Sequence, residues 1–161
     1  MRRPAVTLRH LAIALPVVFV LHVLEEVPGF VAWFNRHVDP DITPRSFYSV
    51  VATGFIVTLA IAAVVATARE RGSALVAAAW VGFLMLANGL FHLAAALVGR
   101  GYAPGVITGT LLYLPLSLLF LGAVARECRM PLPLVAGVAL LGGIPMYLHG
   151  WLIVFRGSRL F

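Results

Sequence analysis

The sequence has no lysine and only one cysteine, and charged residues make up 11% of its 161 residues. A single cysteine excludes a disulfide framework within the chain, and Cys128 suits a reduced loop on the cytosolic side of a membrane. Soluble domains contain about 25% charged residues, so this scarcity of charge argues against a soluble globular fold. Together these absences indicate a protein that lies in a lipid bilayer.

The basic residues of the chain are all arginines, twelve of them against six acidic residues, and the formal net charge is +6. A basic balance can indicate nucleic-acid binding. Here, however, the arginines lie in short segments between apolar runs, which is typical of the loops of a membrane protein. We therefore expect the lipid bilayer as a partner and no nucleic acid.

Apolar residues dominate what is there: 61% of the chain is hydrophobic and its mean hydropathy is +1.00. Five apolar runs can each cross about 30 Å of hydrocarbon, which needs roughly 17–25 residues. They predict membrane-spanning helices at about 10–27, 47–68, 73–98, 104–125 and 133–155. We expect one domain, 1–161, with an all-α fold: a polytopic transmembrane helical bundle.

The first apolar run has the charge pattern of a signal peptide but lacks a small-residue cleavage site, because Glu25, Glu26, Val27 and Pro28 follow it. We therefore interpret it as a retained first helix. Seven arginines fall on the side of the N-terminus and five on the other side, which favours a cytoplasmic N-terminus in the plasma or inner membrane.

The longest connection, 28–46, carries Phe30, Trp33 and Phe34 at a spacing that places them on one helix face. It predicts a short helix in the membrane interface. Two roles stay open for this segment: an aromatic anchor at the level of the headgroups, or a lid over whatever lies beneath it.

Three ionisable residues interrupt the first helix, namely His22, Glu25 and Glu26, and all three lie on one face. Each ionisable group in the apolar part of a membrane helix costs about 2.5–3.5 kcal/mol, so these groups need partners. The third helix offers Asn88 and His92, one turn apart, and the fifth helix offers His149.

The depths of the three histidines agree. At 1.5 Å per residue, His22, His92 and His149 lie about 8–9 Å from corresponding ends of helices that run parallel to one another. Three imidazoles with two carboxylates suit a divalent cation, which would neutralise two glutamates that otherwise repel each other. Di-iron bundles use four carboxylates, so we expect one ion, and zinc, iron and manganese all fit.

We therefore expect His22, Glu26, His92 and His149 to bind the metal and Glu25 to act as the general base. Asn88 would orient a ligand or a metal-bound water. The predicted function is that of a metal-dependent membrane enzyme, a hydrolase or an oxidoreductase, with an apolar or lipid-like substrate. Two alternatives stay open: a proton- or metal-linked carrier or sensor, and a non-catalytic membrane subunit whose polar cluster locks the helices together.

Each of these residues also has a simpler interpretation. A single intramembrane histidine often makes only an interhelical hydrogen bond, and Asn88 can do the same. The two glutamates lie near a helix end, where they can pair with Arg36 or Arg45. His10 and His37 are expected to be interfacial.

The motif His-x-x-Glu-Glu at 22–26 resembles the HXXEE family of small polytopic membrane proteins. The downstream Asn88-x-x-x-His92, the segment Tyr102-Ala103-Pro104-Gly105 and the late His149 are similar to the pattern of that family. Its function is unassigned, so the resemblance supports the site without naming a reaction. The inverted zincin motif His-x-x-Glu-His is also close, but Glu26 stands where its second histidine would be.

Overall fold

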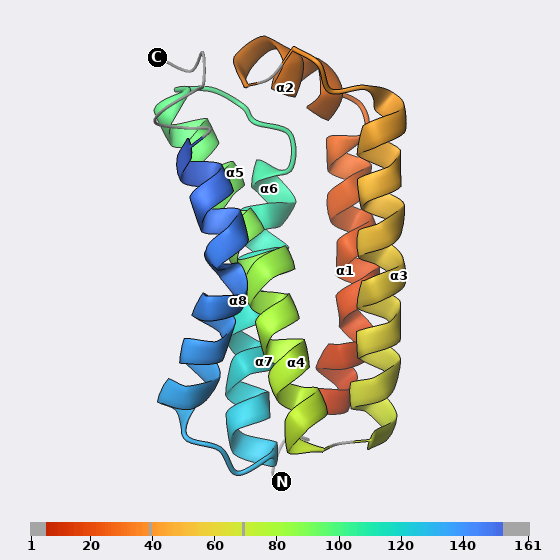
Figure 1. Ribbon diagram of the computed structural model, residues 1–161, viewed down its shortest axis with the longest axis vertical. Coiled ribbons are helices and arrows are strands. Elements are labelled where there is room, and N and C mark those ends of the chain that lie inside the picture. The colour runs from red at the N-terminus through yellow and green to blue at the C-terminus, as the bar shows by residue number, and fades with distance from the viewer. Residues whose placement is uncertain (1–5, 39, 69, 153–161) are drawn as a thin grey trace, which may run out of the picture.

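The computed structural model describes residues 6–38, 40–68 and 70–152, and over these ranges it contains helices and no strands (Figure 1). The elements in chain order are α1 (Leu8–Glu26), α2 (Phe30–His37), α3 (Pro44–Ala68), α4 (Arg71–Val81), η1 (Gly82–Ala87), α5 (Asn88–Val98), α6 (Val106–Thr108), η2 (Gly109–Tyr113), α7 (Leu114–Glu127) and α8 (Leu132–Leu152). The segments η1 and η2 are π-helical.

Within the described residues, five helical stretches are long and apolar enough to cross a membrane. They are Leu8–Glu26, Pro44–Ala68, Arg71–Val98, Val106–Glu127 and Leu132–Trp151. This confirms the all-helical, five-span fold, with ends that differ from the expected ones by a few residues. The expected last turn at 153–155, together with Arg2, Arg3, Arg156 and Arg159, lies outside the described residues.

The outer surface of the bundle is apolar, as expected for helices surrounded by lipid. Large side chains such as Leu24, Leu97 and Leu141 are more than half exposed. A soluble protein of this size rarely exposes so much contiguous apolar surface. The molecule is therefore a membrane protein.

The short helix α2 lies across one end of the bundle, directly after α1 (Figure 1). This confirms the expected short segment after the first span. The Phe30 ring at its start stacks on Phe47 of α3, with ring centroids 5.2 Å apart, and lies 6.1 Å from the ring of His92. The helix thus packs over the end of the bundle that holds His92.

The closest helix crossing joins α4–η1 to α8 through glycine. A Cβ atom on Gly82 would lie 2.0 Å from the carbonyl oxygen of Ala139, and one on Gly142 would lie 2.3 Å from that of Ala79. Small residues allow the two backbones to touch, and in a membrane such close packing is a main source of helix association. This contact fixes the long third span against the fifth.

A second close crossing involves Gly109, but Gly105 does not take part in it. The spacing of Gly105 and Gly109 predicts a small-residue pair on one helix face. The structure instead places Gly105 before α6 with φ +93°, and packs Gly109 against Gly89 of α5. The reason is that the fourth span begins only at Val106, so Gly105 serves the preceding turn.

The π-helical segment η2 lies directly before Pro115. The backbone N–H of Leu114 donates to the carbonyl of Gly109, five residues earlier. A proline ring collides with the carbonyl four residues before it, and a wider turn relieves that clash. The η2 segment therefore follows from Pro115, and it places Tyr113 inside the bundle, where it is fully buried.

Candidate metal centre

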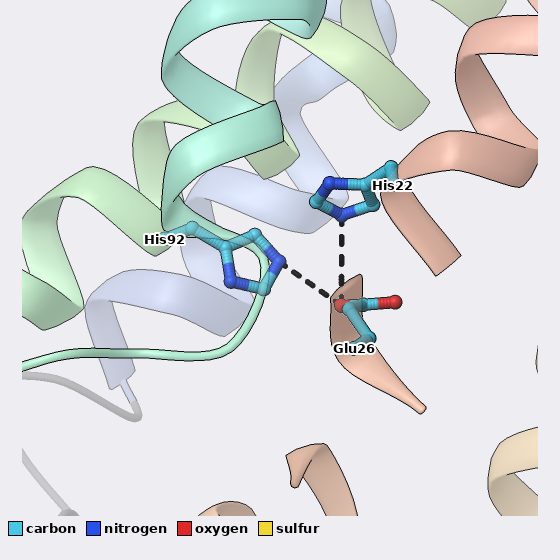
Figure 2. A group of neighbouring side chains, drawn as sticks. All are labelled: His22, Glu26 and His92. Carbon is cyan, nitrogen blue, oxygen red and sulfur yellow. Dashed lines mark ion pairs between the residues drawn. The ribbon is translucent and has the colours of Figure 1, made fainter. Parts of the chain in front are cut away.

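Three side chains from two spans converge inside the bundle: His22 and Glu26 of α1 and His92 of α5 (Figure 2). Glu26 Oε1 lies 3.5 Å from His22 Nε2 and 3.2 Å from His92 Nε2. The two imidazole rings meet edge to face, with centroids 5.0 Å apart. Each residue offers one ligand atom, and these atoms all lie within 4.8 Å of one another.

All three side chains are withdrawn from the surface. His22 and His92 are 1% exposed and Glu26 is 6% exposed. Among the described residues, no arginine lies within ion-pair distance of Glu26, whose recorded partners are the two histidines. A buried carboxylate is costly unless a proton or a cation compensates its charge.

The hydrogen bonds of Thr108 fix the tautomer of His22. The Thr108 hydroxyl donates to Glu25 Oε2 at 2.5 Å, and the same hydroxyl oxygen lies 2.8 Å from His22 Nδ1. A hydroxyl has a single proton, which here goes to the carboxylate, so Nδ1–H of His22 must donate to Thr108. In a neutral imidazole the other nitrogen, Nε2, then carries a lone pair.

That lone pair faces the carboxylate of Glu26. His22 Nε2 is buried and makes no hydrogen bond with any described residue, although Glu26 Oε1 is 3.5 Å away. His92 Nδ1 is also buried without a partner in the described part of the chain. An unsatisfied buried polar atom costs about 1–3 kcal/mol, and either a proton on His22 or a cation between the nitrogen and the carboxylate would satisfy this pair.

Two further residues hold the imidazoles in place. The ring of Tyr113 packs on His22 with centroids 4.1 Å apart. On the other side, a Cβ atom on Gly105 would lie 2.7 Å from His92 Cε1 and 2.9 Å from His22 Cε1. With its positive φ and this close approach, only glycine suits position 105, and its backbone closes over both rings.

The structure places Glu25, the expected general base, outside the group of three. Its carboxylate accepts hydrogen bonds from the Tyr102 hydroxyl (3.0 Å) and from the backbone N–H groups of Ile107 (3.0 Å) and Thr108 (2.7 Å). Partial burial, then the hydrogen bond to Glu25 and its charge, raise the pKa of the Tyr102 phenol above its usual value. Glu25 therefore anchors the start of α6 and, through Thr108, positions His22.

Two other expected residues, Asn88 and His149, share a cavity with the three but do not join them. The cavity has a volume of about 580 Å³, and both side chains line it together with His22, Glu26 and His92. Asn88 Oδ1 is buried without a hydrogen-bond partner among the described residues. His149 has an exposed side chain, and the ligand group found in the described residues does not include it.

The outer edge of this cavity lies at the surface of the bundle. Its lining residues include Val50 of α3, which is 72% exposed, and the exposed His149 of α8. Aromatic rings such as Phe19, Phe30 and Trp80 form much of the remaining wall. The volume falls in the range of about 300–1,000 Å³ that is usual for small-molecule sites. The cavity therefore leads from the surface of the bundle to the neighbourhood of His22 and His92, each of which is 1% exposed.

If the Thr108 bridge orients His22, then Thr108→Val, which removes the hydroxyl but keeps the shape, weakens divalent-metal binding about 10–100-fold, as loss of such supporting hydrogen bonds does elsewhere. The measurement is competition with a calibrated chelator. Thr110→Val is the matched control, because the Thr110 hydroxyl is buried without a partner among the described residues. Equal affinities for the two variants would contradict this role of Thr108.

The fold and the cluster together define a class: an all-helical membrane protein with a buried His–Glu–His group near one end of a five-span bundle. Within that class the chain belongs to the HXXEE family. The family model, described as a protein of unknown function with HXXEE motif, matches residues 13–120, which is more than half of the chain. No curated protein and no solved structure matches this chain.

The matched range has its own bearing on the site. It contains His22, Glu25, Glu26 and His92 but ends before α8 and His149. The three side chains that converge in the structure therefore all lie inside the part of the chain that the family model describes.

Proposed function

We propose that this protein is a membrane-embedded, metal-dependent enzyme that acts on an apolar or lipid-like substrate entering from the bilayer. His22, Glu26 and His92 would hold one divalent ion of zinc, iron or manganese. The observation that carries this proposal is the lone pair of His22 Nε2 facing the buried carboxylate of Glu26, because a cation satisfies both at once.

The donor set supports a catalytic rather than a structural ion. Structural zinc sites use four protein ligands, whereas catalytic zinc sites use three and leave a position for water or substrate. Two histidines and one carboxylate are also the ligand set of non-haem iron oxygenases. When bound, such an ion supplies a Lewis acid and an activated water or oxygen ligand.

The remaining residues have roles that follow from their positions. The apolar wall of the cavity excludes bulk water, which strengthens the electrostatic interactions within it. Glu25 acts through Thr108 to hold Nδ1–H of His22 in place, which keeps Nε2 available as a ligand. Asn88 lines the cavity one turn before His92, and its amide oxygen is buried without a hydrogen-bond partner among the described residues.

The arginine distribution completes the proposal. With the N-terminus on the cytoplasmic side of the plasma or inner membrane, α1 ends at the opposite face, and the metal centre lies just beneath that face. The loop that carries Cys128 then lies on the cytoplasmic side, with the N-terminus.

Elemental analysis of the detergent-purified protein tests the proposal. We expect about one equivalent of zinc, iron or manganese per chain, and below about a tenth of an equivalent after His92→Ala, because loss of one of three ligands removes most of the affinity. His37→Ala is the control, since His37 bonds to the Trp33 carbonyl on α2. The variant His149→Ala is expected to retain the metal.

Two results would overturn the proposal. The first is a wild-type protein with less than about a tenth of an equivalent of any of these metals after growth in metal-supplemented medium. The second is a metal content that His92→Ala leaves unchanged. Either result would favour a cluster that only joins α1 to α5.

A further inference from the structure

The cavity beside the metal centre has a polar end and an apolar end. The polar end comprises His22, Glu26, His92 and Asn88, near the end of the bundle that α2 crosses. Deeper in the bundle, the wall is formed by residues such as Phe19 and Leu84. A site with this asymmetry fits an amphiphile whose polar group lies at the metal centre and whose apolar part points toward the membrane interior.

The residues that line the cavity extend along most of one span. Along the continuous helix α4–η1–α5, its lining residues are Trp80, Phe83, Leu84, Asn88, Phe91 and His92. Trp80 precedes His92 by twelve residues, which corresponds to about 18 Å at 1.5 Å per residue. A volume of about 580 Å³ spread over such a length describes a narrow slot that suits one chain.

The charges of the wall restrict the polar group of the ligand. No arginine lines the cavity in the described part of the chain, and the sequence has no lysine. In the metal-free protein a phosphate or sulfate group would therefore have only the three lining histidines as possible cationic partners, which is costly in an apolar site. An uncharged group avoids that cost, and the amide of Asn88 at this end suits a ligand with a hydroxyl or an amide group.

Trp80 lies at the apolar end of the slot. Its indole Nε1–H donates to the hydroxyl of Thr58 at 3.0 Å, and that hydroxyl donates in turn to the Gly54 carbonyl at 2.7 Å. Thr58 is fully buried. The indole is therefore held in one orientation by α3, and of the lining residues on its own span it is the farthest from His92.

We propose that this cavity binds one uncharged, single-chain amphiphile with a hydroxyl or amide group, and that Trp80 sets the longest chain the cavity accepts. The polar group lies at the His22–Glu26–His92 end beside Asn88, and the end of the chain meets the indole. This assignment rests on the proposed function for the role of the polar end. The slot and the upper limit that Trp80 sets on chain length depend only on the apolar wall, and not on a bound metal.

The test uses saturated alkan-1-ols of increasing length, added to the detergent-purified full chain. Native mass spectrometry counts bound molecules, and the shift of the thermal unfolding midpoint ranks the chain lengths. We expect one bound alcohol per chain and a sharp upper limit of length in the wild type. In Trp80→Ala that limit moves up by about two carbons or more, because the longer chain fills the space of the indole.

Matched variants distinguish alcohol binding in the slot from non-specific partitioning of the alcohol into the detergent. Trp151→Ala removes a tryptophan of α8 that does not line this cavity, and it leaves the length limit unchanged. Gly54→Leu places a larger side chain in the slot, where even a Cβ atom would lie 3.4 Å from the Phe19 ring, and it weakens binding about tenfold or more. If Trp80→Ala does not fold, Trp80→Phe is expected to shift the limit in the same direction by less.

The headgroup is tested with alkanoates of the same lengths after chelation, because a bound ion would itself attract a carboxylate. They are expected to bind at least about tenfold more weakly than the alcohols. Equal binding of the two series, or the same length limit in wild type and Trp80→Ala, overturns the inference.

Metal content, measured on the same preparations, keeps this inference distinct from the proposed function. Alcohol binding without metal would contradict the enzyme proposal alone. Metal binding without a length limit set by Trp80 would contradict the slot alone.

Discussion

Glu26→Gln is expected to abolish metal binding while the protein remains folded. The amide keeps the shape of the side chain but removes the negative charge, which lies 3.5 Å and 3.2 Å from the Nε2 atoms of His22 and His92. We expect the affinity for zinc, iron or manganese to fall by more than about 100-fold. Loss of a residue that only hydrogen-bonds to a metal ligand typically costs about 10–100-fold. The measurement is chelator competition on the purified variant.

The same variant separates a metal centre from a purely structural cluster. A ligand present at 100 times its dissociation constant stabilises the folded state by about 2.7 kcal/mol, so chelation lowers the unfolding midpoint of metal-loaded wild type. Chelation is expected to leave Glu26→Gln unaffected. Glu70→Gln is the control and is expected to behave like wild type. Glu70 is exposed and lies at the start of the third span, at the end far from His92. A wild-type midpoint that does not respond to chelation would contradict the metal proposal.

The largest effect on folding is expected from Gly142→Leu. Even a Cβ atom at this position would lie 2.3 Å from the Ala79 carbonyl oxygen, so α4 and α8 must separate. Overpacking of a tight contact costs about 1–3 kcal/mol and occasionally more, and here both backbones must move. We expect loss of most monodisperse protein on size-exclusion chromatography in detergent.

Gly137→Leu is the matched control on the same helix. No atom lies within 4 Å of a Cβ built at Gly137, so a leucine there extends into open space. It is expected to purify like wild type. Similar losses for the two variants would show that the α4–α8 contact does not depend on the absence of a side chain at Gly142.

The sequence predicts the five spans well because length and apolarity alone define them. It also predicts that His22 and His92 meet, since depth in a membrane follows from the number of residues to a helix end. Depth says nothing about rotation about the helix axis or about the distance between axes. This is why His149, at a matching depth, lines the cavity without joining the other two.

The different roles of the two neighbouring glutamates could not be predicted from the sequence either. Glu25 and Glu26 differ by about 100° around α1, and both lie on the side of His22. The position of α6 separates their roles. Thr108 of α6 donates hydrogen bonds to Glu25, whereas Glu26 lies beside the two histidines. Thr108 is 86 residues from His22 in sequence, and a threonine at the start of an apolar run gives no signal of that contact.

The sequence predicts the close helix crossings only in part. Glycines at small-residue spacing predict close helix contacts, but the spacing cannot say which helix is the partner. Gly109 packs against Gly89 of another span, and Gly105 does not share that contact. The closest contact, at Gly82 and Gly142, joins the third span to the fifth. The π-helical turn before Pro115 follows from the proline, whereas η1 contains no proline.

The glycine that covers the imidazoles has a consequence for how the centre is loaded. The main chain at position 105 passes close to the rings of His22 and His92, and glycine has no side chain that could change rotamer to uncover them. For an ion bound as proposed, the route that the structure offers is the cavity beside the two histidines. Under the metal proposal, exchange of that ion with the aqueous phase would be slower than the rotamer changes of exposed side chains, because both imidazoles are 1% exposed.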